Sequence, residues 1–163
     1  MFPDDIDALA RRVVEAAVAR GLMIAVAESC TGGLVAGALT AVAGSSAALD
    51  RGFVTYSNAA KSEMLGVPAD LIEARGAVSE AVARAMAEGA VGRSAAKVSV
   101  AITGVAGPGG GTDEKPVGLV HFAATGPSGL THAEHRFGDP GREAIRLESV
   151  RVALRLLLDR IGA

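Results

Sequence analysis

The sequence predicts an α/β fold, a three-layer α/β/α sandwich whose mixed, mostly parallel sheet ends in a β-hairpin. Two patterns predict this class. Over the first two thirds of the chain, short apolar runs alternate with segments whose apolar residues recur every three or four positions, as in strands that alternate with helices. Nearer the C-terminus, two apolar runs flank the turn-forming sequence GPSG at 126–129, which is typical of a hairpin.

Each element has its own signal. Residues 4–20 form an amphipathic helical pattern, and Gly21 is suited to end that helix. Asn58 and Ser79 are the expected N-caps of the helices that begin beside them, and Pro68 suits the first turn of another. Further helices are predicted at 34–42, 58–65, 67–76, 80–91 and 141–161, and strands at 22–28, 51–57, 97–103, 117–125 and 130–137.

Composition excludes several classes of protein. The chain has 163 residues, a one-domain length, so we expect a single domain over 1–163. It carries 16 basic and 18 acidic side chains, a net charge of -2, and 3% aromatic residues, so we expect no nucleic-acid partner. Hydrophobic residues make up 50%, which predicts a folded core, yet no apolar run is long enough for a membrane span.

The sequence offers neither a disulfide nor a recognisable metal site. Cys30 is the only cysteine, and His132 and His135 lie three apart in a predicted strand, so they face opposite sides of the sheet. His121 lies between apolar residues and is expected in the core or at the surface. We therefore expect no metal and no other cofactor. The N-terminal residues lack the basic and apolar regions of a signal peptide, so we expect a cytoplasmic location.

Polar segments follow three predicted strands at the points where those strands end. These segments are 28–33, 56–58 and 103–104. In open α/β sheets, ligands bind outside the carboxyl ends of the strands. If the three strands are parallel neighbours, the segments meet in one crevice, and we expect the functional site there.

The first of these segments, ESCTGG at 28–33, places a hydroxyl and a thiol at the start of a helix. Unpaired N–H groups at a helix start can bind a phosphate or a developing oxyanion, which makes Ser29 a candidate nucleophile. Cys30 is the rival, because a helix N-terminus lowers the pKa of a thiol, unless it is a small buried residue. In the alternative interpretation, Ser29 or Thr31 only caps the helix.

A serine nucleophile needs a base, and no histidine lies near this segment in the sequence. Only three of the basic residues are lysines, and one of them, Lys61, lies one turn into the helix after strand 51–57, close to Tyr56. A desolvated lysine there would be neutral and could accept the serine proton. The alternative is a solvated lysine on a helix surface.

Two further features suit a ligand. The glycine-rich segment 104–116 matches neither a P-loop nor a dinucleotide-binding fingerprint, and is either a flexible loop over the site or a plain connector. Arg142 and Arg146 lie one turn apart on the last helix, where their guanidinium groups suit a phosphate or a carboxylate. The alternative is a solvated arginine face.

Several motifs in order make the chain resemble the C-terminal domain family of CinA, which includes stand-alone nicotinamide-nucleotide amidases of the PncC type. The resemblance covers nearly the whole chain and is carried by AESCTGG (27–33), RGFVTYSNAAK (51–61), GAVSE (76–80) and ITGVAGPGGGTDEKPVG (102–118). It implies an amidohydrolase that converts nicotinamide mononucleotide to nicotinate mononucleotide and ammonia, in pyridine-nucleotide recycling. It further implies an α/β/α domain without metal, and a homo-oligomer (a dimer or a larger assembly).

The resemblance also implies roles for individual residues. Ser29 corresponds to the nucleophile and Lys61 to its base, while Tyr56 and Thr103 match the other catalytic positions. The residues expected to bind the mononucleotide are Cys30, Thr31, Gly32, Gly33, Gly104, Arg142 and Arg146.

Two other functions stay open from the sequence. The chain could be a nucleotide-binding regulatory module without turnover, since CinA-like proteins are also tied to competence and damage responses. It could also be an amidase with the same mechanism and another amide substrate. Larger CinA proteins carry a further N-terminal domain, whose activity we do not expect from these residues.

Overall fold

The predicted order of helices and strands is confirmed by the computed structural model, which describes all 163 residues. The helices are α1 (Asp4–Arg20), α2 (Leu34–Thr40), α3 (Asn58–Leu65), α4 (Ala69–Arg75), α5 (Glu80–Gly92) and α6 (Arg142–Ile161). The strands are β1 (Ile24–Glu28), β2 (Leu49–Val54), β3 (Val98–Gly104), β4 (Leu119–Gly126) and β5 (Gly129–Arg136). A short 3₁₀ turn spans Ser45–Ala47.

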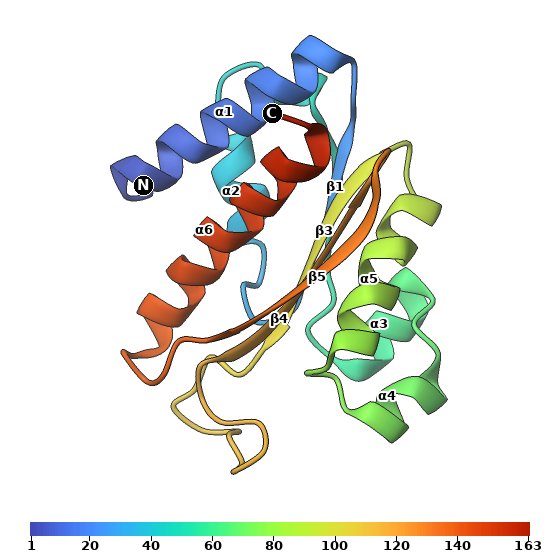
Figure 1. The fold of residues 1–163 in the computed structure, drawn as a ribbon, viewed down its shortest axis with the longest axis vertical. Helices are drawn as coiled ribbons and strands as arrows, with labels where there is room; N and C mark the ends of the chain where they lie inside the picture. Colours follow the sequence, from blue (N-terminus) through green and yellow to red (C-terminus); the bar gives the residue numbers. More distant parts are fainter.

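The five strands form one mixed sheet in the order β2-β1-β3-β4-β5. The first three strands are parallel to one another, and β4 runs antiparallel to both β3 and β5. Helices cover both faces: α6, α1 and α2 lie on one side of the sheet, and α5, α3 and α4 on the other (Figure 1). The predicted three-layer α/β/α sandwich with a late hairpin is therefore confirmed.

The position of the inner strands explains why their sequences are continuous apolar runs. All five residues of β1 are buried, because the strand lies inside a sheet that is covered on both faces. Its side chains alternate between two cores: Ile24 and Val26 contact the layer of α1 and α6, while Ala25 and Ala27 contact the layer of α5. The small alanines on the second face leave room for α5 to pack closely.

Two of the three helix starts predicted from single residues differ in detail from the prediction. Ser79 does cap α5, since its hydroxyl accepts the N–H of Val82. In α3, however, the cap is Ser57, whose Oγ accepts the N–H of Ala60 at 3.0 Å, and Asn58 is the first helical residue. Ser57 has the extended backbone that an N-cap needs, which Asn58 inside the helix lacks. Pro68 likewise precedes α4 as its N-cap residue instead of lying in the first turn.

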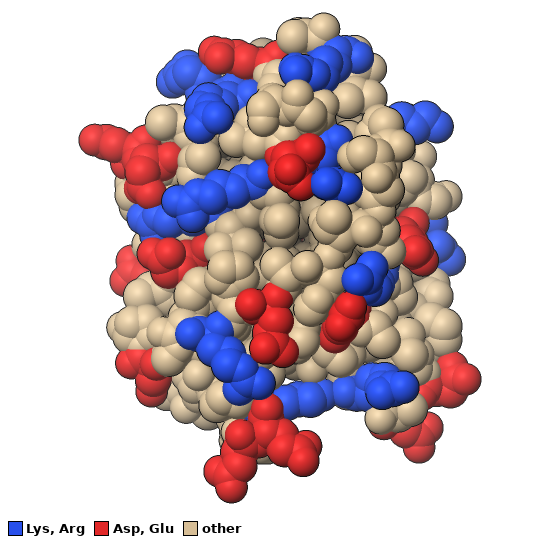
Figure 2. All heavy atoms as spheres, in the orientation of Figure 1, with Lys and Arg blue, Asp and Glu red and all other residues tan.

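The surface and the helices agree with the composition. On the face shown in Figure 2, acidic and basic side chains are interspersed, with no large patch of one sign. None of the helices combines the length and the apolar character that crossing a bilayer requires.

Candidate active site

The carboxyl ends of β2, β1 and β3 meet at one edge of the sheet, as predicted. Glu28, the last residue of β1, lies opposite Val54 on one neighbour and Ile102 on the other. Hydrogen bonds continue past the strand ends: the N–H of Ser29 donates to Ile102 O at 3.0 Å, and the N–H of Thr55 donates to Glu28 O at 2.8 Å. The start of the ESCTGG turn is therefore fixed from both sides.

The helix after this turn is not capped by Ser29 or Thr31, so that alternative is wrong. The cap comes from Glu28, which is fully buried and accepts the N–H groups of Val35 at 2.9 Å and Ala36 at 3.0 Å. A carboxylate at this position satisfies two helix-start donors and interacts favourably with the helix dipole. The chain can reverse between Glu28 and α2 because Gly32 and Gly33 adopt φ values of 58° and 104°.

Ser29 and Lys61, which are far apart in the sequence, lie side by side. Lys61 Nζ is 2.9 Å from Ser29 Oγ and donates to Thr55 O at 2.8 Å. The lysine is 1% exposed, and no carboxylate pairs with it. Burial therefore lowers the pKa of Lys61 from its ordinary value of 10.5. A neutral amine next to a hydroxyl can accept the hydroxyl proton, which is the arrangement of an activated serine.

Cys30 is placed less well for nucleophilic attack. It is 6% exposed, and burial raises the pKa of its thiol to about 11. The expected lowering of this pKa by the helix start is therefore wrong, because Glu28 occupies that helix start and desolvation dominates. Cys30 is a protonated, small apolar group in the wall of the site.

A cavity of about 290 Å³ opens over Ser29. The glycine-rich loop forms much of its wall, so this loop covers the site and is not a plain connector. The residues that line the cavity are Ser29, Cys30, Tyr56, Val78, Gly104, Val105, Ala106, Gly107, Gly109, Gly110 and Arg142. Its volume is near the lower end of the range for small-molecule sites.

Several backbone N–H groups in the wall of this cavity have no hydrogen-bond partner. In the ESCTGG turn, the N–H group of Cys30 is free and lines the cavity. Thr31, Gly32 and Gly33, which were expected to bind the ligand, are not among the residues that line it. In the glycine-rich loop, the N–H groups of Ala106, Gly107, Gly109 and Gly110 also have no acceptor. Such groups are suited to negative oxygen atoms of a ligand.

The two arginines of α6 have different surroundings. Arg142 lines the cavity and donates to Gly107 O at 2.7 Å and to the Tyr56 hydroxyl at 3.1 Å. Arg146 donates to Cys30 O at 3.1 Å and Thr31 O at 3.2 Å, so it holds the ESCTGG turn. Of the two candidates for a phosphate, the structure brings only Arg142 to the cavity.

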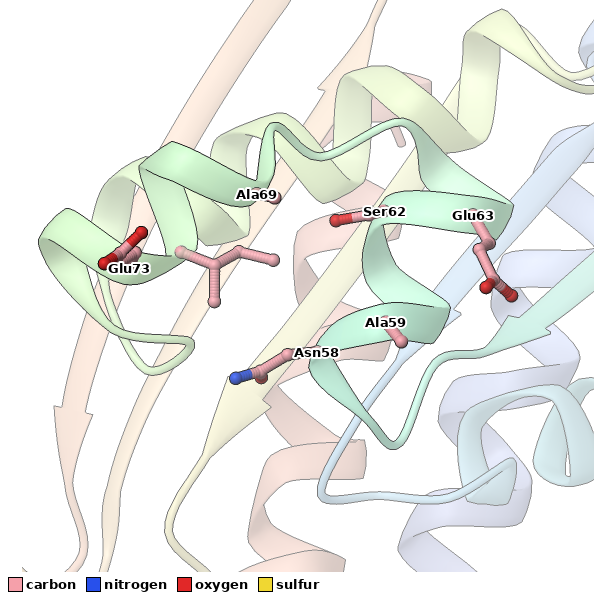
Figure 3. Close-up of a pocket in the computed structure, with 7 residues that line it drawn as sticks. Asn58, Ala59, Ser62, Glu63, Ala69 and Glu73 are labelled. Atoms are coloured by element: carbon pink, nitrogen blue, oxygen red, sulfur yellow. The ribbon is translucent and has the colours of Figure 1, made fainter.

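A larger hollow of about 530 Å³ lies between α3 and α4 (Figure 3). Its labelled polar side chains are Asn58, Ser62, Glu63 and Glu73, and no hydrogen bond joins any two of them. The hollow contains neither a cation nor a nucleophile–base pair, so the chemistry points to the smaller cavity at Ser29.

Comparison with known proteins decides the family. The family model for the CinA C-terminal domain matches residues 6–161. The chain is 54% identical to a CinA-like protein of Synechococcus sp. (strain RCC307) over 157 residues, which cover 96% of this chain and 38% of that protein. This chain belongs to the CinA C-terminal domain family.

Solved structures agree with this assignment. The competence/damage inducible protein CihA of Agrobacterium tumefaciens superposes with a TM-score of 0.97 at 55% identity, covering 100% of this chain and 99% of that one. A CinA superfamily protein of Klebsiella pneumoniae gives 0.91 at 38% identity, over 96% of this chain and 98% of that chain. The CinA domain thus forms the same fold alone, although it spans 38% of the length of the curated relatives it matches.

Thr103, expected at a catalytic position of this CinA domain, does not orient Lys61. It is 1% exposed, and its Oγ1 donates to Ala77 O at 2.8 Å, with no hydrogen bond to Lys61. Ala77 precedes Val78, which lines the cavity. Thr103 therefore fastens the loop that forms one wall of the site.

Sequence reasoning missed Glu28 and the carbonyl group of Thr55. Glu28 had a detectable signal, since a carboxylate directly after four apolar strand residues needs a buried partner. The carbonyl of Thr55 had no signal in the sequence, because every residue carries a carbonyl group.

Glu28→Gln is expected to lower the free energy of unfolding by about 1–3 kcal/mol, because the amide group turns one of two acceptors into a donor that faces an N–H. Urea unfolding of the purified CinA domain measures this change. Glu88→Gln, at an exposed position of α5, is the matched control and should leave the midpoint unchanged. Equal midpoints for both variants would contradict the capping role of Glu28.

Proposed function

We propose that this CinA domain is an amidohydrolase that converts nicotinamide mononucleotide to nicotinate mononucleotide and ammonia. The observation that carries the proposal is the 2.9 Å contact between Ser29 Oγ and a buried Lys61 that has no carboxylate partner. A hydroxyl with an adjacent neutral amine is suited to acyl transfer. The choice of this amide rests on the family resemblance and on a cavity that offers donors for anionic oxygens.

The reaction begins with proton transfer. Lys61 Nζ takes the hydroxyl proton of Ser29 while Oγ attacks the carboxamide carbon of the substrate. The free N–H group of Cys30, which lines the cavity, holds the oxyanion that forms, a type of contact worth roughly 3–4 kcal/mol. Lys61 then gives its proton to the departing ammonia, and the acyl group stays on Ser29. Water hydrolyses this ester by the reverse sequence, with Lys61 again as the base.

The phosphate of the mononucleotide would bind on the far side of the cavity from the reacting carbonyl. Arg142 supplies the positive charge there, and the free N–H groups of the glycine-rich loop supply further donors. Arg142 already holds that loop through Gly107 O, so phosphate binding and loop position are linked through one side chain.

The direct test is ammonia release from nicotinamide mononucleotide by the purified protein in the presence of EDTA, with free nicotinamide as the substrate without a phosphate. Turnover of the nucleotide and not of nicotinamide supports the proposal. Absence of turnover together with nucleotide binding by calorimetry would favour the regulatory module. Absence of both would leave the substrate of this serine–lysine pair to be found among other amides.

Arg142→Ala is expected to raise KM for the nucleotide about 10-fold to 100-fold and to change kcat less, because a charge-assisted hydrogen bond contributes about 1.5–3 kcal/mol. Steady-state kinetics with the nucleotide measures both constants. Arg155→Ala, an exposed position on the same helix, is the matched control and should leave KM unchanged. An equal KM for wild type and Arg142→Ala would remove Arg142 from the phosphate site.

A further inference from the structure

Two histidines form a pair on the α5 side of the sheet, next to the candidate active site and outside its chemistry. His121 Nδ1 and His132 Nε2 are 2.9 Å apart. The ring centroids are 5.2 Å apart and the ring planes are inclined by 26°, so the rings lie edge to edge with these two nitrogens directed at each other. His121 belongs to β4 and His132 to the edge strand β5.

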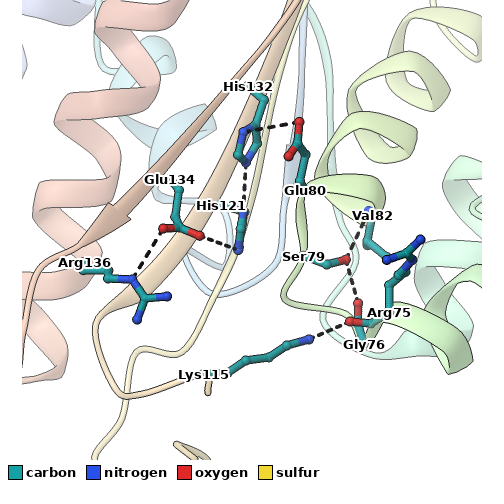
Figure 4. Close-up of polar contacts among 10 residues, drawn as sticks. All are labelled: Arg75, Gly76, Ser79, Glu80, Val82, Lys115, His121, His132, Glu134 and Arg136. Carbon is teal, nitrogen blue, oxygen red and sulfur yellow. Dashed lines mark hydrogen bonds and ion pairs between the residues drawn. The ribbon is translucent and has the colours of Figure 1, made fainter. Parts of the chain in front are cut away.

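Each outer nitrogen of the pair faces a carboxylate (Figure 4). His121 Nε2 is 3.7 Å from Glu134 Oε1, and His132 Nδ1 is 3.6 Å from Glu80 Oε1. The order is therefore Glu134, His121, His132, Glu80, with three polar contacts between four side chains. Glu80 is the first residue of α5, so the chain of contacts joins the hairpin to the start of that helix.

Only the contact between the two rings has the length of a hydrogen bond, so it requires one proton between the facing nitrogens. The outer contacts, at 3.7 Å and 3.6 Å, are ion-pair distances and too long for hydrogen bonds. Two neutral imidazoles can supply the proton between the rings, but one outer nitrogen then presents a lone pair to a carboxylate. A third proton removes that lone pair, and the two carboxylates favour the positive charge that it brings.

We propose that His121 and His132 hold one shared proton and titrate as a single unit that ties β5 to the start of α5. His121 is the acceptor in this unit: burial lowers the pKa of His121, so it stays neutral with its proton on Nε2. His132 carries the charge: its Nε2 donates to His121, and its protonated Nδ1 lies at an ion-pair distance of 3.6 Å from Glu80. A second added proton would place two donors face to face and break the contact between the rings.

Three basic residues lie around the pair and its carboxylates. Arg84 of α5 pairs at 3.0 Å with the same Glu80 oxygen that faces His132, and Arg136 of β5 pairs with the other oxygen of Glu134 at 3.4 Å, so each carboxylate also faces an arginine. Lys115, from the loop before β4, donates to Arg75 O at 2.6 Å and opposes a charge on His121. The two carboxylates alone contact the rings.

The pair is connected to the wall of the cavity through the neighbouring residues on both sides. His121 is the cross-strand partner of Thr103, and Thr103 Oγ1 holds Ala77 O. On the other side, Glu80 follows the segment 76–79 that contains Val78 of the cavity wall. Loss of the proton on His132 Nδ1 neutralises the pair and leaves Glu80 facing a lone pair, so this segment loses an ion pair at its α5 end.

The test is an NMR titration of the whole protein in EDTA. The imidazole signals can be assigned individually because the chain contains only three histidines. Two steps separated by more than about one pH unit are expected for His121 and His132, with Nδ1 of His121 unprotonated between them. The backbone N–H signals of Ala77 and Val78 are expected to move with the upper step. Two independent single transitions, or a proton on His121 Nδ1 between the steps, would refute the shared proton. Signals of Ala77 and Val78 that do not change during the titration would refute the link to the cavity.

Matched variants distinguish coupled titration of His121 and His132 from independent titration of each histidine. His121→Asn keeps an acceptor for His132 Nε2 but cannot titrate, so His132 should show one step. His132→Asn should likewise leave one step for His121, which keeps the test open if either variant fails to fold. His135→Asn removes the third histidine, on the other face of β5, and should leave both steps in place. Two steps that persist in His121→Asn would refute the coupling.

Discussion

Ser29→Ala is expected to abolish hydrolysis of nicotinamide mononucleotide, with kcat lowered by a factor on the order of 10⁵. The substitution removes the one atom that can form the acyl intermediate. It should leave the fold intact, because the only hydrogen bond of Ser29 Oγ is the one with Lys61, and the N–H of Ser29 keeps its bond to Ile102 O. Initial rates of ammonia release, with circular dichroism as a check on folding, measure the effect.

The control for this variant is the neighbouring thiol. Cys30→Ala is expected to keep most of the activity, since the thiol is buried and protonated at working pH. If Ser29→Ala retained turnover and Cys30→Ala lost it, the nucleophile would be the thiol and the role of Ser29 would be wrong.

The sequence predicts the fold well where an amphipathic helical pattern extends over many residues, or where both faces of a strand are covered. The helix at 4–20 and the helix that ends at 161 have the predicted extents within one residue. The ends of β2 were predicted less well: it begins at Leu49, two residues early, because Leu49 pairs with Ile24 of β1. Such an end is set by a neighbouring strand, and no local pattern reports it.

At the candidate site, the sequence indicates the groups that carry unusual chemistry and misses the contacts made to the backbone. Ser29 is recognisable because it follows a buried strand at the start of a helix, and Lys61 because the chain has only three lysines. The bonds of Arg146 to Cys30 O and of Thr103 to Ala77 O were not predictable. Carbonyl groups are the same in every residue, so only the folded chain shows which of them accept.

These contacts also explain why the site can hold a buried amine. The carbonyl of Thr55 accepts one hydrogen bond from Lys61 but brings no negative charge, and the only fully buried carboxylate, Glu28, is directed at the start of α2. A carboxylate beside Lys61 would favour its charged form and remove the base. The capping role of Glu28 and the lowered pKa of Lys61 are thus two consequences of one arrangement.

Lys61→Arg is the second change with a large expected effect, a fall in kcat on the order of 10⁴ or more. Arginine keeps the positive charge and the donors but does not lose its proton in proteins, so it cannot accept the proton of Ser29. A module that only binds nucleotides would tolerate this change. Calorimetry with the nucleotide, run beside the ammonia assay, distinguishes lost chemistry from lost binding, and wild-type turnover in Lys61→Arg would refute the lysine base.

The pH dependence of the wild-type reaction tests the same base without a substitution. The active form requires neutral Lys61, so kcat/KM should rise with pH as the lysine loses its proton. Because burial disfavours the charged amine, the pKa of Lys61 is lowered, and the midpoint of this rise should lie below the ordinary value of 10.5. Lys97→Arg, at an exposed position, should leave the profile unchanged. A midpoint at the ordinary value would mean that Lys61 is solvated in the working enzyme, and a flat profile that another group takes the proton.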